Sequence, residues 1–342
     1  MSDLLLSFIM PTYNSAEYLA DTMDSLVASI GDYSRLVEII CVDDGSWDNT
    51  VTILEGYKSI YDNLIIIRNE HGGVSQARNT ALDIVSGKYI SFVDSDDLYE
   101  KDFLNTFISL DKNFDFLFTD VGGIKDEISF QEINEKEKLK IFKNNFNLGE
   151  YTIHPGIAGK FFRTSLINDI QLRFNTQLSF AEDILFNFTL LTASKHVILS
   201  PVNFYHVNGT HSLMYYNEKN LKGQIVFVDR IRQILKGYSE SSETVLIENF
   251  IILKAMTVYI DRYFGPLWLN GTYSLNEASK LMKSTIEDND FSKAFNSNRL
   301  DYSIGNRYVV FRKLLRFRQY KLCLLYNRIM DKIKGYERFR KQ

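Results

Sequence analysis

The first hundred residues repeat one pattern, in which a short apolar run is followed by polar residues and then by a segment with helical spacing. The apolar runs are residues 7–10, 37–42, 64–68 and 89–93. Their length and their β-branched and aromatic content are typical of strands. The segments with helical spacing are residues 16–29, 50–60 and 74–86. Strands that alternate with helices predict a parallel sheet covered by helices on both faces.

The rest of the chain divides into a mixed part and a helical part. Residues 125–148 are polar and charged enough to predict a loop or insertion rather than core. The remaining expected elements are strands over 115–119 and 197–206, the latter with Pro201 at its edge, and helices over 161–167 and 182–192. From about Asn217 only long helices are expected. The sequence therefore predicts two domains, residues 1–216, with 150–216 as an acceptor-side segment, and residues 217–342.

Composition excludes several classes of protein. The chain has 342 residues, of which 45% are hydrophobic and 24% charged, as in ordinary globular proteins. Cys41 and Cys323 are the only cysteines and lie far apart, which excludes a disulfide framework or a cysteine zinc site. The N-terminus lacks the pattern of a signal peptide, and the chain lacks an uninterrupted apolar stretch of about 18 residues. We therefore expect a cytoplasmic protein that does not span a membrane.

Three polar clusters come directly after predicted strands, at residues 11–14, 43–46 and 94–97. Ligands of open parallel sheets bind outside the carboxyl ends of the strands, so these clusters are expected to converge on one crevice. The third cluster holds three carboxylates within four residues, a set of hard oxygen ligands that suits Mg²⁺ or Mn²⁺. A solvated acidic turn, or an N-cap for a helix starting at Leu98, explains that cluster equally well when it is taken alone.

Two further features favour a nucleotide. Asp43 is placed to accept hydrogen bonds from a base or a ribose, as acidic residues at strand ends do in nucleotide-binding folds, whereas Asp44 fits helix capping as well. Residues 71–79 combine a glycine-rich turn with a helix N-terminus, an ordinary anion site in which Arg78 and Asn79 lie one turn inside. The glycines of this segment are also explained by the turn alone.

These clusters together resemble the large family 2 glycosyltransferases with the GT-A fold. The segments that carry the resemblance are residues 7–14 (SFIMPTYN), 42–46 (VDDGS), 72–79 (GGVSQARN) and 92–97 (FVDSDD). The residues of these segments, their order and their spacing all match the family. The resemblance covers roughly residues 5–215. It implies a Rossmann-like mixed sheet with a C-terminal helical region, and an enzyme of the type that builds bacterial surface polysaccharides.

The resemblance also implies the roles of individual residues. The residues implied to bind the donor nucleotide are Pro11, Thr12, Tyr13, Asn14, Asp43, Asp44, Gly73, Arg78, Asn79, Asp94 and Ser95. Asp96 is implied to bind Mn²⁺ or Mg²⁺, as part of an aspartate-any-aspartate motif. In the segment 180–186, Asp183 corresponds to the catalytic base, and Glu182 lies on the acceptor side. Without the resemblance, capping of the helix 184–192 would explain both acidic residues.

Three other candidates are weaker. Family members commonly have an arginine where His206 stands, so a metal or diphosphate contact there competes with a simple packing role. His211 is a weaker candidate for the same role. Lys160 falls where the family has a similar lysine near the acceptor, and a surface lysine is the alternative.

The implied reaction moves a hexose or N-acetylhexosamine from a UDP-sugar to a hydroxyl of a lipid-linked surface glycan, such as capsule, exopolysaccharide or teichoic acid. One displacement at the anomeric carbon inverts its configuration. A sugar nucleotidyltransferase is a rival, but it would need a basic loop near the N-terminus, and residues 11–14 contain no lysine or arginine. A non-catalytic glycan-binding module is the second rival, and it has no need of three converging clusters.

The C-terminal end differs from the rest of the chain in charge. Residues 299–342 carry a net charge of +10, which leaves −14 for residues 1–298. Residues 308–341 interleave basic and apolar side chains at helical spacing, which favours a helix on an anionic membrane surface. There are two alternatives: a helix packed in the core with a solvated basic face, or a patch that binds nucleic acid. The net negative charge of residues 1–298 argues against nucleic acid. We expect a peripheral protein on the inner face of the cell membrane, with residues 217–298 as an acceptor or homo-oligomer module.

Overall fold

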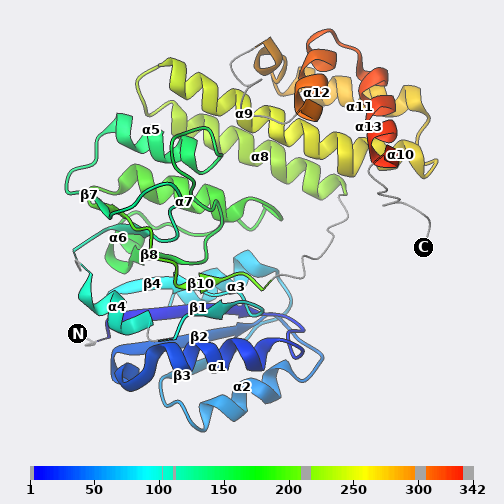
Figure 1. Cartoon of the computed structure of the whole chain (residues 1–342). Helices are drawn as coiled ribbons and strands as arrows, with labels where there is room; N and C mark the ends of the chain where they lie inside the picture. The colour runs from blue at the N-terminus through cyan, green and yellow to red at the C-terminus, as the bar shows by residue number, and fades with distance from the viewer. Residues whose placement is uncertain (1–3, 102, 111–112, 209–216, 297–305, 334–342) are drawn as a thin grey trace. The chain divides into compact units, whose positions relative to one another are not determined.

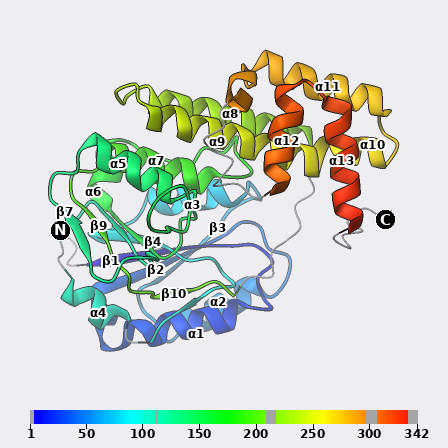
Figure 2. The same cartoon turned by 45° about the horizontal axis from the view of Figure 1, so that its top comes forward.

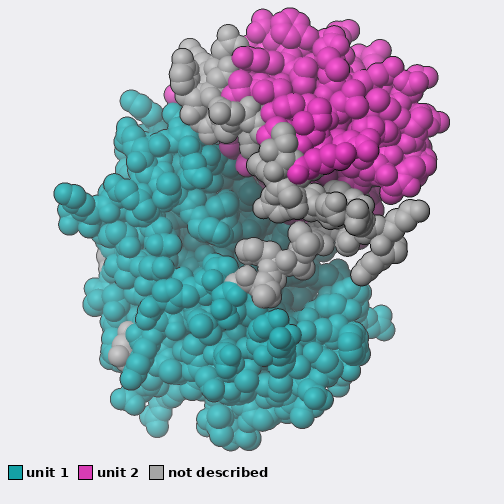
Figure 3. All heavy atoms as spheres, turned by 45° about the vertical axis from the view of Figure 1, so that its right-hand side comes forward, with its two compact units in different colours: residues 1–177, 181–212 teal, residues 178–180, 213–342 magenta. Residues whose placement is uncertain are grey.

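The computed structural model describes residues 4–101, 103–110, 113–208, 217–296 and 306–333. The chain forms two compact units (Figure 3). Unit 1 comprises residues 1–177 and 181–212, and unit 2 comprises residues 178–180 and 213–342. All described strands belong to unit 1, and the described part of unit 2 is helical.

The first half of unit 1 is a parallel sheet, as predicted. Its strands are β1 (Leu6–Thr12), β2 (Val37–Asp43), β3 (Leu64–Arg68) and β4 (Tyr89–Phe92). They lie in the order β3-β2-β1-β4 and are mutually parallel. Every residue of β1, β2 and β4 is buried, which explains why these strands have continuous apolar runs in place of alternation.

Helices cover both faces of this half-sheet (Figure 1). The helices are α1 (Leu19–Ile30), which continues into the 3₁₀ segment η1 (Gly31–Leu36), α2 (Thr50–Lys58), α3 (Val74–Leu82) and α4 (Phe103–Ser109). Helices α1 and α4 bury Met23 and Phe103 in one core with Phe8 of β1. Helix α3 packs on β1 and β2 from the opposite side.

The second half of the sheet makes it mixed, as the resemblance implied. Its strands are β8 (Lys160–Arg163), β6 (Phe116–Phe118), β9 (Val197–Leu199) and β7 (Ile128–Phe130), in that order after β4. Strand β8 runs antiparallel to both β4 and β6, and β7 runs antiparallel to β9. A separate two-stranded ribbon pairs β10 (Tyr205–His206) with β5 (Leu98–Tyr99).

Three expectations about this half were wrong. Residues 125–148 are not a plain loop, because they contain β7 and a capped helix, α5 (Glu135–Asn144), which buries Phe142 against Phe188. The helix expected over 161–167 is a strand up to Arg163, and only then the short helix α6 (Thr164–Asp169). The strand expected over 197–206 is interrupted around Pro201, so β9 and β10 belong to different sheets. Helix α7 (Glu182–Ala193) agrees with expectation.

The described residues of unit 2 form helices and turns without strands, as expected from about Asn217 onward. They are α8 (Glu218–Leu235), α9 (Ser242–Tyr259), the π-helical turn η2 (Ile260–Phe264), α10 (Gly265–Leu269), α11 (Leu275–Asp288), the 3₁₀ turn η3 (Ser292–Asn296), α12 (Asn306–Arg316) and α13 (Tyr320–Ile333). Asn217, Ser241 and Ser274 start α8, α9 and α11 with reciprocal capping hydrogen bonds. None of the described helices has the length and hydrophobicity needed to cross a bilayer.

Candidate active site

The carboxyl ends of β1, β2 and β4 lie next to one another and carry the three predicted clusters. Thr12 ends β1 and is the register partner of Asp43, which ends β2. Asp94 follows β4 after one residue. The structure therefore brings the three turns to one edge of the sheet.

Two buried polar atoms at this edge lack a hydrogen-bond partner among the described residues. Thr12 and Asp43 are 1% and 0% exposed, and neither Thr12 Oγ1 nor Asp43 Oδ1 has a partner. The other oxygen of Asp43 accepts the Ser46 N–H at 3.2 Å. A buried polar atom without a partner costs about 1–3 kcal/mol, so proteins rarely leave two side by side. The arrangement indicates a place where a ligand supplies the missing donor and acceptor.

The neighbouring residues of the first cluster have different surroundings. The ring of Tyr13 is 45% exposed and stacks on the ring of His71, with centroids 4.4 Å apart. The Asn14 N–H donates to Ser46 Oγ, and its side-chain oxygen accepts the Trp47 N–H, so Asn14 joins the first two turns. Pro11 is buried within β1. Of these three, Tyr13 is the residue placed to stack on a planar ligand.

Asp44 organises the glycine-rich turn. Its two carboxylate oxygens accept the N–H groups of Gly72 and Gly73, each at 2.8 Å, and His71 Nδ1 lies 2.9 Å from Oδ2. Gly73 then starts α3 with φ of +91°, a conformation that favours glycine. This contact differs from both roles that the sequence predicts for Asp44, a nucleotide ligand or a cap for the helix that follows it.

The acidic turn after β4 is held by a tyrosine from β10. Tyr205 Oη donates to Asp97 Oδ2 at 2.5 Å and accepts the Asp94 N–H at 3.0 Å. The second oxygen of Asp97 accepts the Asn208 N–H at 2.8 Å. Ser95 Oγ lies 2.7 Å from Ser15 Oγ, which ties the turn to the loop after β1. Both oxygens of buried Asp97 are thus engaged within the protein.

Asp94 and Asp96 are the other two carboxylates of this turn, and their oxygens are of the kind that could hold a divalent cation. The Asp94 side chain is 42% exposed and Asp96 is half-buried. Within the described residues, no group of three or more His, Cys, Asp and Glu side chains is arranged to hold a metal. One or two carboxylates, completed by substrate phosphates and water, are a usual environment for Mg²⁺ in nucleotide enzymes. The donor set therefore fits a cation that binds together with a nucleotide diphosphate.

Arg78 links the acidic turn to α7. It is buried, and its guanidinium donates to Asp94 Oδ1 at 3.0 Å and to Glu182 Oε1 at 3.2 Å. The same group lies over the rings of Phe174 and Phe92, at 5.3 and 6.0 Å from their centroids. Arg78 Nε has no partner among the described residues. The structure thus gives Arg78 a bridging role beside its predicted contact with the nucleotide.

Asp183 lies in the first turn of α7. Its Oδ1 accepts the Ile184 N–H at 2.7 Å, as the capping alternative supposed. Burial and the neighbouring Glu182 raise the pKa of Asp183 to about 7, against the opposing effects of Arg78 and Lys160. A Cβ atom added at Gly156 would lie 3.5 Å from Asp183 Oδ2, so the backbone of that glycine passes close to the carboxylate. A carboxylate with a pKa near 7 is suited to accept a proton at neutral pH.

Lys160 is not the surface lysine that the alternative reading supposed. It is 2% exposed, and its Nζ donates to the carbonyl oxygens of His154 at 2.8 Å and Gly156 at 2.5 Å. Burial lowers the pKa of Lys160 to about 7. Asn187 Nδ2 donates to Pro155 O and Gly156 O, at 3.0 Å each. Lys160 and Asn187 therefore hold the backbone turn that lies against Asp183.

Two other residues predicted for the site, Asn79 and His206, have partners within the protein. Both polar atoms of the Asn79 side chain bond the backbone of Phe174, at 2.8 and 2.9 Å, which gives Asn79 a structural role, and its contact with the nucleotide stays a prediction. His206 Nε2 lies 2.5 Å from Glu100 Oε1 on the exposed surface, and its metal role stays a prediction. His211 lies outside the described residues.

Comparison with known sequences decides the family. The profile described as Glycosyl transferase family 2 matches residues 7–170, which include all three turns, Arg78 and Lys160. Residues 7–170 are a glycosyl transferase family 2 domain. Two curated relatives of the chain have names that include poly(ribitol-phosphate).

One such relative is the poly(ribitol-phosphate) beta-glucosyltransferase of Bacillus spizizenii, 30% identical over 275 residues that make up 76% of this chain and 40% of the relative. Another is the poly(ribitol-phosphate) beta-N-acetylglucosaminyltransferase TarS of Staphylococcus aureus, 31% identical over 206 residues, 58% of this chain and 35% of TarS. The chain spans less than half the length of either relative.

Solved structures confirm the fold of the family 2 domain. S. aureus TarS 1–349 in complex with UDP-GlcNAc superimposes with a TM-score of 0.66 at 22% identity, covering 97% of this chain and 92% of that one. The complex of the same fragment with UDP gives a TM-score of 0.64 at 23% identity, covering 99% and 94%. The chain therefore has the GT-A fold with a helical C-terminal region.

Sequence reasoning missed several residues of the family 2 site. Ser75, in the first turn of α3, is 4% exposed, and its Oγ has no partner among the described residues. Its place in the glycine-rich segment was a signal that could have identified it. His154 precedes a Pro-Gly turn, which marks a loop but no function. Nothing near Tyr205 in the sequence indicates that its hydroxyl holds a turn a hundred residues earlier.

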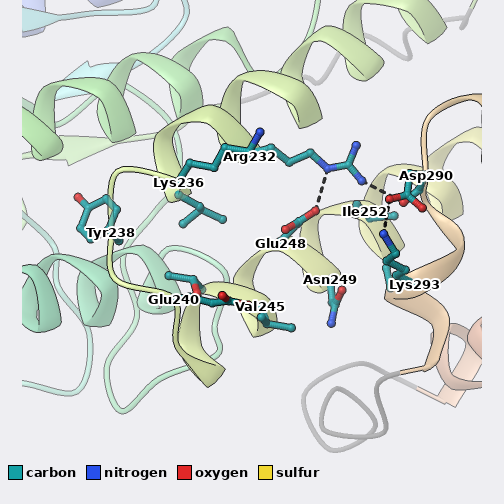
Figure 4. A pocket seen from close by; sticks show the side chains of 13 residues that line it. Arg232, Lys236, Tyr238, Glu240, Val245, Glu248, Asn249, Ile252, Asp290 and Lys293 are labelled. Atoms are coloured by element: carbon teal, nitrogen blue, oxygen red, sulfur yellow. Dashed lines mark hydrogen bonds and ion pairs between the residues drawn. The ribbon is translucent and has the colours of Figure 1, made fainter.

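Unit 2 contains a hollow of its own, of about 670 Å³, between α8, α9 and the segment around η3 (Figure 4). Arg232 donates to Glu248 at 2.8 Å, and Lys293 pairs with Asp290 at 2.7 Å (Figure 4). The hollow is thus lined by charges that neutralise one another. It shares no residue with the family 2 domain.

Proposed function

We propose that this chain is an inverting glycosyltransferase that moves a hexose or N-acetylhexosamine from a UDP-sugar to a hydroxyl of a lipid-linked surface glycan, such as capsule, exopolysaccharide or teichoic acid. The observation that carries the donor assignment is the pair Thr12 Oγ1 and Asp43 Oδ1, buried and without partners at the ends of adjacent strands. The carboxylate is suited to accept the N3–H of uracil, and the hydroxyl can donate to its carbonyl oxygen.

The relatives support the choice of sugar and acceptor. The names of the B. spizizenii and S. aureus proteins state that they transfer glucose and N-acetylglucosamine in β linkage to poly(ribitol-phosphate). Among the surface glycans considered, these names favour a teichoic acid. A β-linked product from an α-linked UDP-sugar requires the single, inverting displacement that we propose.

Different residues would act on the two sides of the donor sugar, one on the attacking hydroxyl and others on the leaving diphosphate. Asp183 would take the proton from the attacking hydroxyl, because its carboxylate lies in the first turn of α7 with a pKa raised to about 7. Arg78 and Glu182 keep α7 tied to the acidic turn, so the base and the leaving-group side keep a defined separation. Mn²⁺ or Mg²⁺ held by Asp96, with Asp94 nearby and His206 as a further candidate, would offset the charge of the departing diphosphate.

We also propose that the protein works in the cytoplasm, peripherally bound to the inner face of the membrane where lipid-linked acceptors are made. The basic C-terminal helices support this placement, because residues 306–333 contain eight lysines and arginines against one acidic residue. An acceptor-binding or homo-oligomer role for residues 217–298 stays a prediction, as does the absence of a nucleic-acid partner.

The nucleotide assignment predicts that UDP binds more tightly than CDP, because cytosine offers an acceptor where uracil offers the N3–H. Thr12→Val removes the unpartnered hydroxyl and is expected to weaken UDP binding roughly 3–10-fold, the effect of one neutral hydrogen bond. The melting temperature of the free protein should not fall, since no internal hydrogen bond is lost.

Calorimetric titration with UDP, CDP, GDP and ADP measures these affinities, and thermal unfolding measures stability. Thr12→Ser keeps the hydroxyl and is the matched control, expected to bind UDP almost as the wild type does. Equal affinity for UDP and CDP, or a Thr12→Val variant that binds normally but melts earlier, would remove the support for a uridine site.

A further inference from the structure

Helix α13 carries apolar side chains on two faces. Cys323 and Leu324 are buried among the helices of unit 2. Leu322, Leu325 and Ile329 recur at spacing i, i+3 and i+7, and they are 48%, 36% and 55% exposed. Residues at this spacing form one stripe along an α-helix. The helix therefore presents an apolar stripe to solvent in addition to its buried face.

A fourth exposed apolar side chain lies in the turn before the helix. Phe317, between α12 and α13, is 66% exposed. A single exposed apolar side chain is ordinary on a protein surface, but four within residues 317–329 form a group that needs an explanation. We call Phe317, Leu322, Leu325 and Ile329 the α13 patch; α12 and α13 lie beside one another in Figure 2.

Basic side chains border the α13 patch. At 100° per residue, Lys321, Arg328 and Lys332 fall along one edge of the stripe, and all three are exposed. Arg316 and Arg318, both exposed, flank Phe317. An apolar stripe with a cationic border is typical of helices that lie in the headgroup region of an anionic bilayer, with the apolar side chains at the acyl boundary.

We propose that the α13 patch and its basic border are the surface by which this protein binds an anionic lipid membrane. The inference deepens the peripheral location proposed above, and it does not depend on the catalytic residues. It narrows the expectation for residues 308–341 within the described residues, because α12 turns Phe311 and Leu315 inward whereas α13 exposes an apolar stripe. Residues 334–341 lie outside the described part of the chain.

A second copy of the chain fits this surface less well. A symmetric contact through α13 would pair the same patch on both copies and would bring the cationic borders together. Like charges at an interface cost several kcal/mol in other complexes, whereas anionic headgroups neutralise them. Charge complementarity therefore selects the lipid surface as the occupant.

Vesicle co-sedimentation of the full chain, without donor or acceptor, tests the proposal. Wild type is expected to bind vesicles of phosphatidylcholine with phosphatidylglycerol and to leave pure phosphatidylcholine vesicles unbound. Leu322→Gln with Ile329→Gln should weaken binding roughly ten-fold, since both apolar side chains lose their acyl contacts while the helix propensity is kept. Lys321→Glu with Lys332→Glu should weaken it at least roughly twenty-fold, at about five-fold for each lost cation.

Matched controls come from exposed residues elsewhere. Ile60→Gln with Val245→Gln replaces side chains that are 73% and 46% exposed, and Lys236→Glu with Lys280→Glu changes the same charge within unit 2. Both controls should bind vesicles like the wild type. Equal loss in controls and α13 variants would overturn the proposal, and so would a wild-type dimer that the α13 variants convert to a monomer without changing vesicle binding. UDP affinity, measured in parallel, shows whether each variant is folded and keeps this test separate from that of the catalytic proposal.

Discussion

Replacing Asp183 by asparagine is expected to lower the rate of sugar transfer roughly a thousand-fold, the typical contribution of a general base. Asparagine keeps the size of the side chain and can still accept the Ile184 N–H, but it cannot take a proton. Binding of the UDP-sugar should change little, because Thr12 and Asp43, the residues proposed to bind the base, lie on β1 and β2. Asp169→Asn on the exposed end of α6 is the matched control and should transfer at the wild-type rate.

The titration of Asp183 gives this prediction a pH profile. Burial raises the pKa of Asp183 to about 7, so the wild-type rate should fall as the pH drops through 7 and the base becomes protonated. A folded-state pKa above the unfolded value means that the protonated carboxyl favours folding at low pH, and that this contribution is lost as the pH rises through 7. Asparagine does not titrate, so the variant should melt no earlier than wild type at pH 8.

Rate measurements from roughly 1.5 pH units below this pKa to roughly 2 units above it, together with thermal unfolding at about pH 8, separate the two roles. A variant that loses activity and also melts earlier at pH 8 would indicate that Asp183 mainly caps α7. A variant that transfers sugar at the wild-type rate would exclude it as the base.

Replacing Asp96 by alanine should remove the dependence of UDP binding on divalent cations and lower turnover at least roughly a hundred-fold, as expected for the loss of electrostatic stabilisation of a leaving diphosphate. Asp97→Ala in the same turn should instead lower the melting temperature of the free protein. The two carboxylate oxygens of Asp97 accept hydrogen bonds from the Tyr205 hydroxyl and the Asn208 N–H. Leaving those donors without partners costs about 1–3 kcal/mol of stability.

Calorimetry of UDP binding with Mn²⁺ and with EDTA, on wild type and on both variants, measures the effect. The assignment of Asp96 fails if wild type binds UDP equally well in Mn²⁺ and in EDTA, or if Asp96→Ala keeps the metal effect. Asp97→Ala then reports whether the turn itself has collapsed.

Sequence reasoning located the sheet edge because its signals are local. Strands buried on both faces have continuous apolar runs, and the polar turn that ends each run marks its carboxyl end. The same reasoning placed Thr12, Asp43 and Asp94 together, since parallel strands end at one edge. Each of these inferences needs only the order of residues along the chain.

Other features depend on contacts between distant segments. Phe161 and Phe162 face opposite sides of the sheet, against Phe103 and Phe92, so a run with helical spacing becomes a central strand. Burial of Lys160 is tolerated because its Nζ donates hydrogen bonds to two backbone carbonyl groups of a loop, which no property of a lysine in sequence reveals. The partners of Asp44 are N–H groups 28 and 29 residues away. Such pairings are set by tertiary structure, and a single sequence carries no record of them.

Turnover of a panel of UDP-sugars in the presence of a ribitol-phosphate polymer is the most direct test of the proposed activity. The assay follows UDP release and incorporation of labelled sugar into the polymer, with Mn²⁺ or with EDTA. We predict that one UDP-hexose or UDP-N-acetylhexosamine is turned over in Mn²⁺, that EDTA abolishes the reaction, and that the product is β-linked. The absence of turnover with every UDP-sugar, metal and glycan acceptor tried would contradict the account and favour a glycan-binding module.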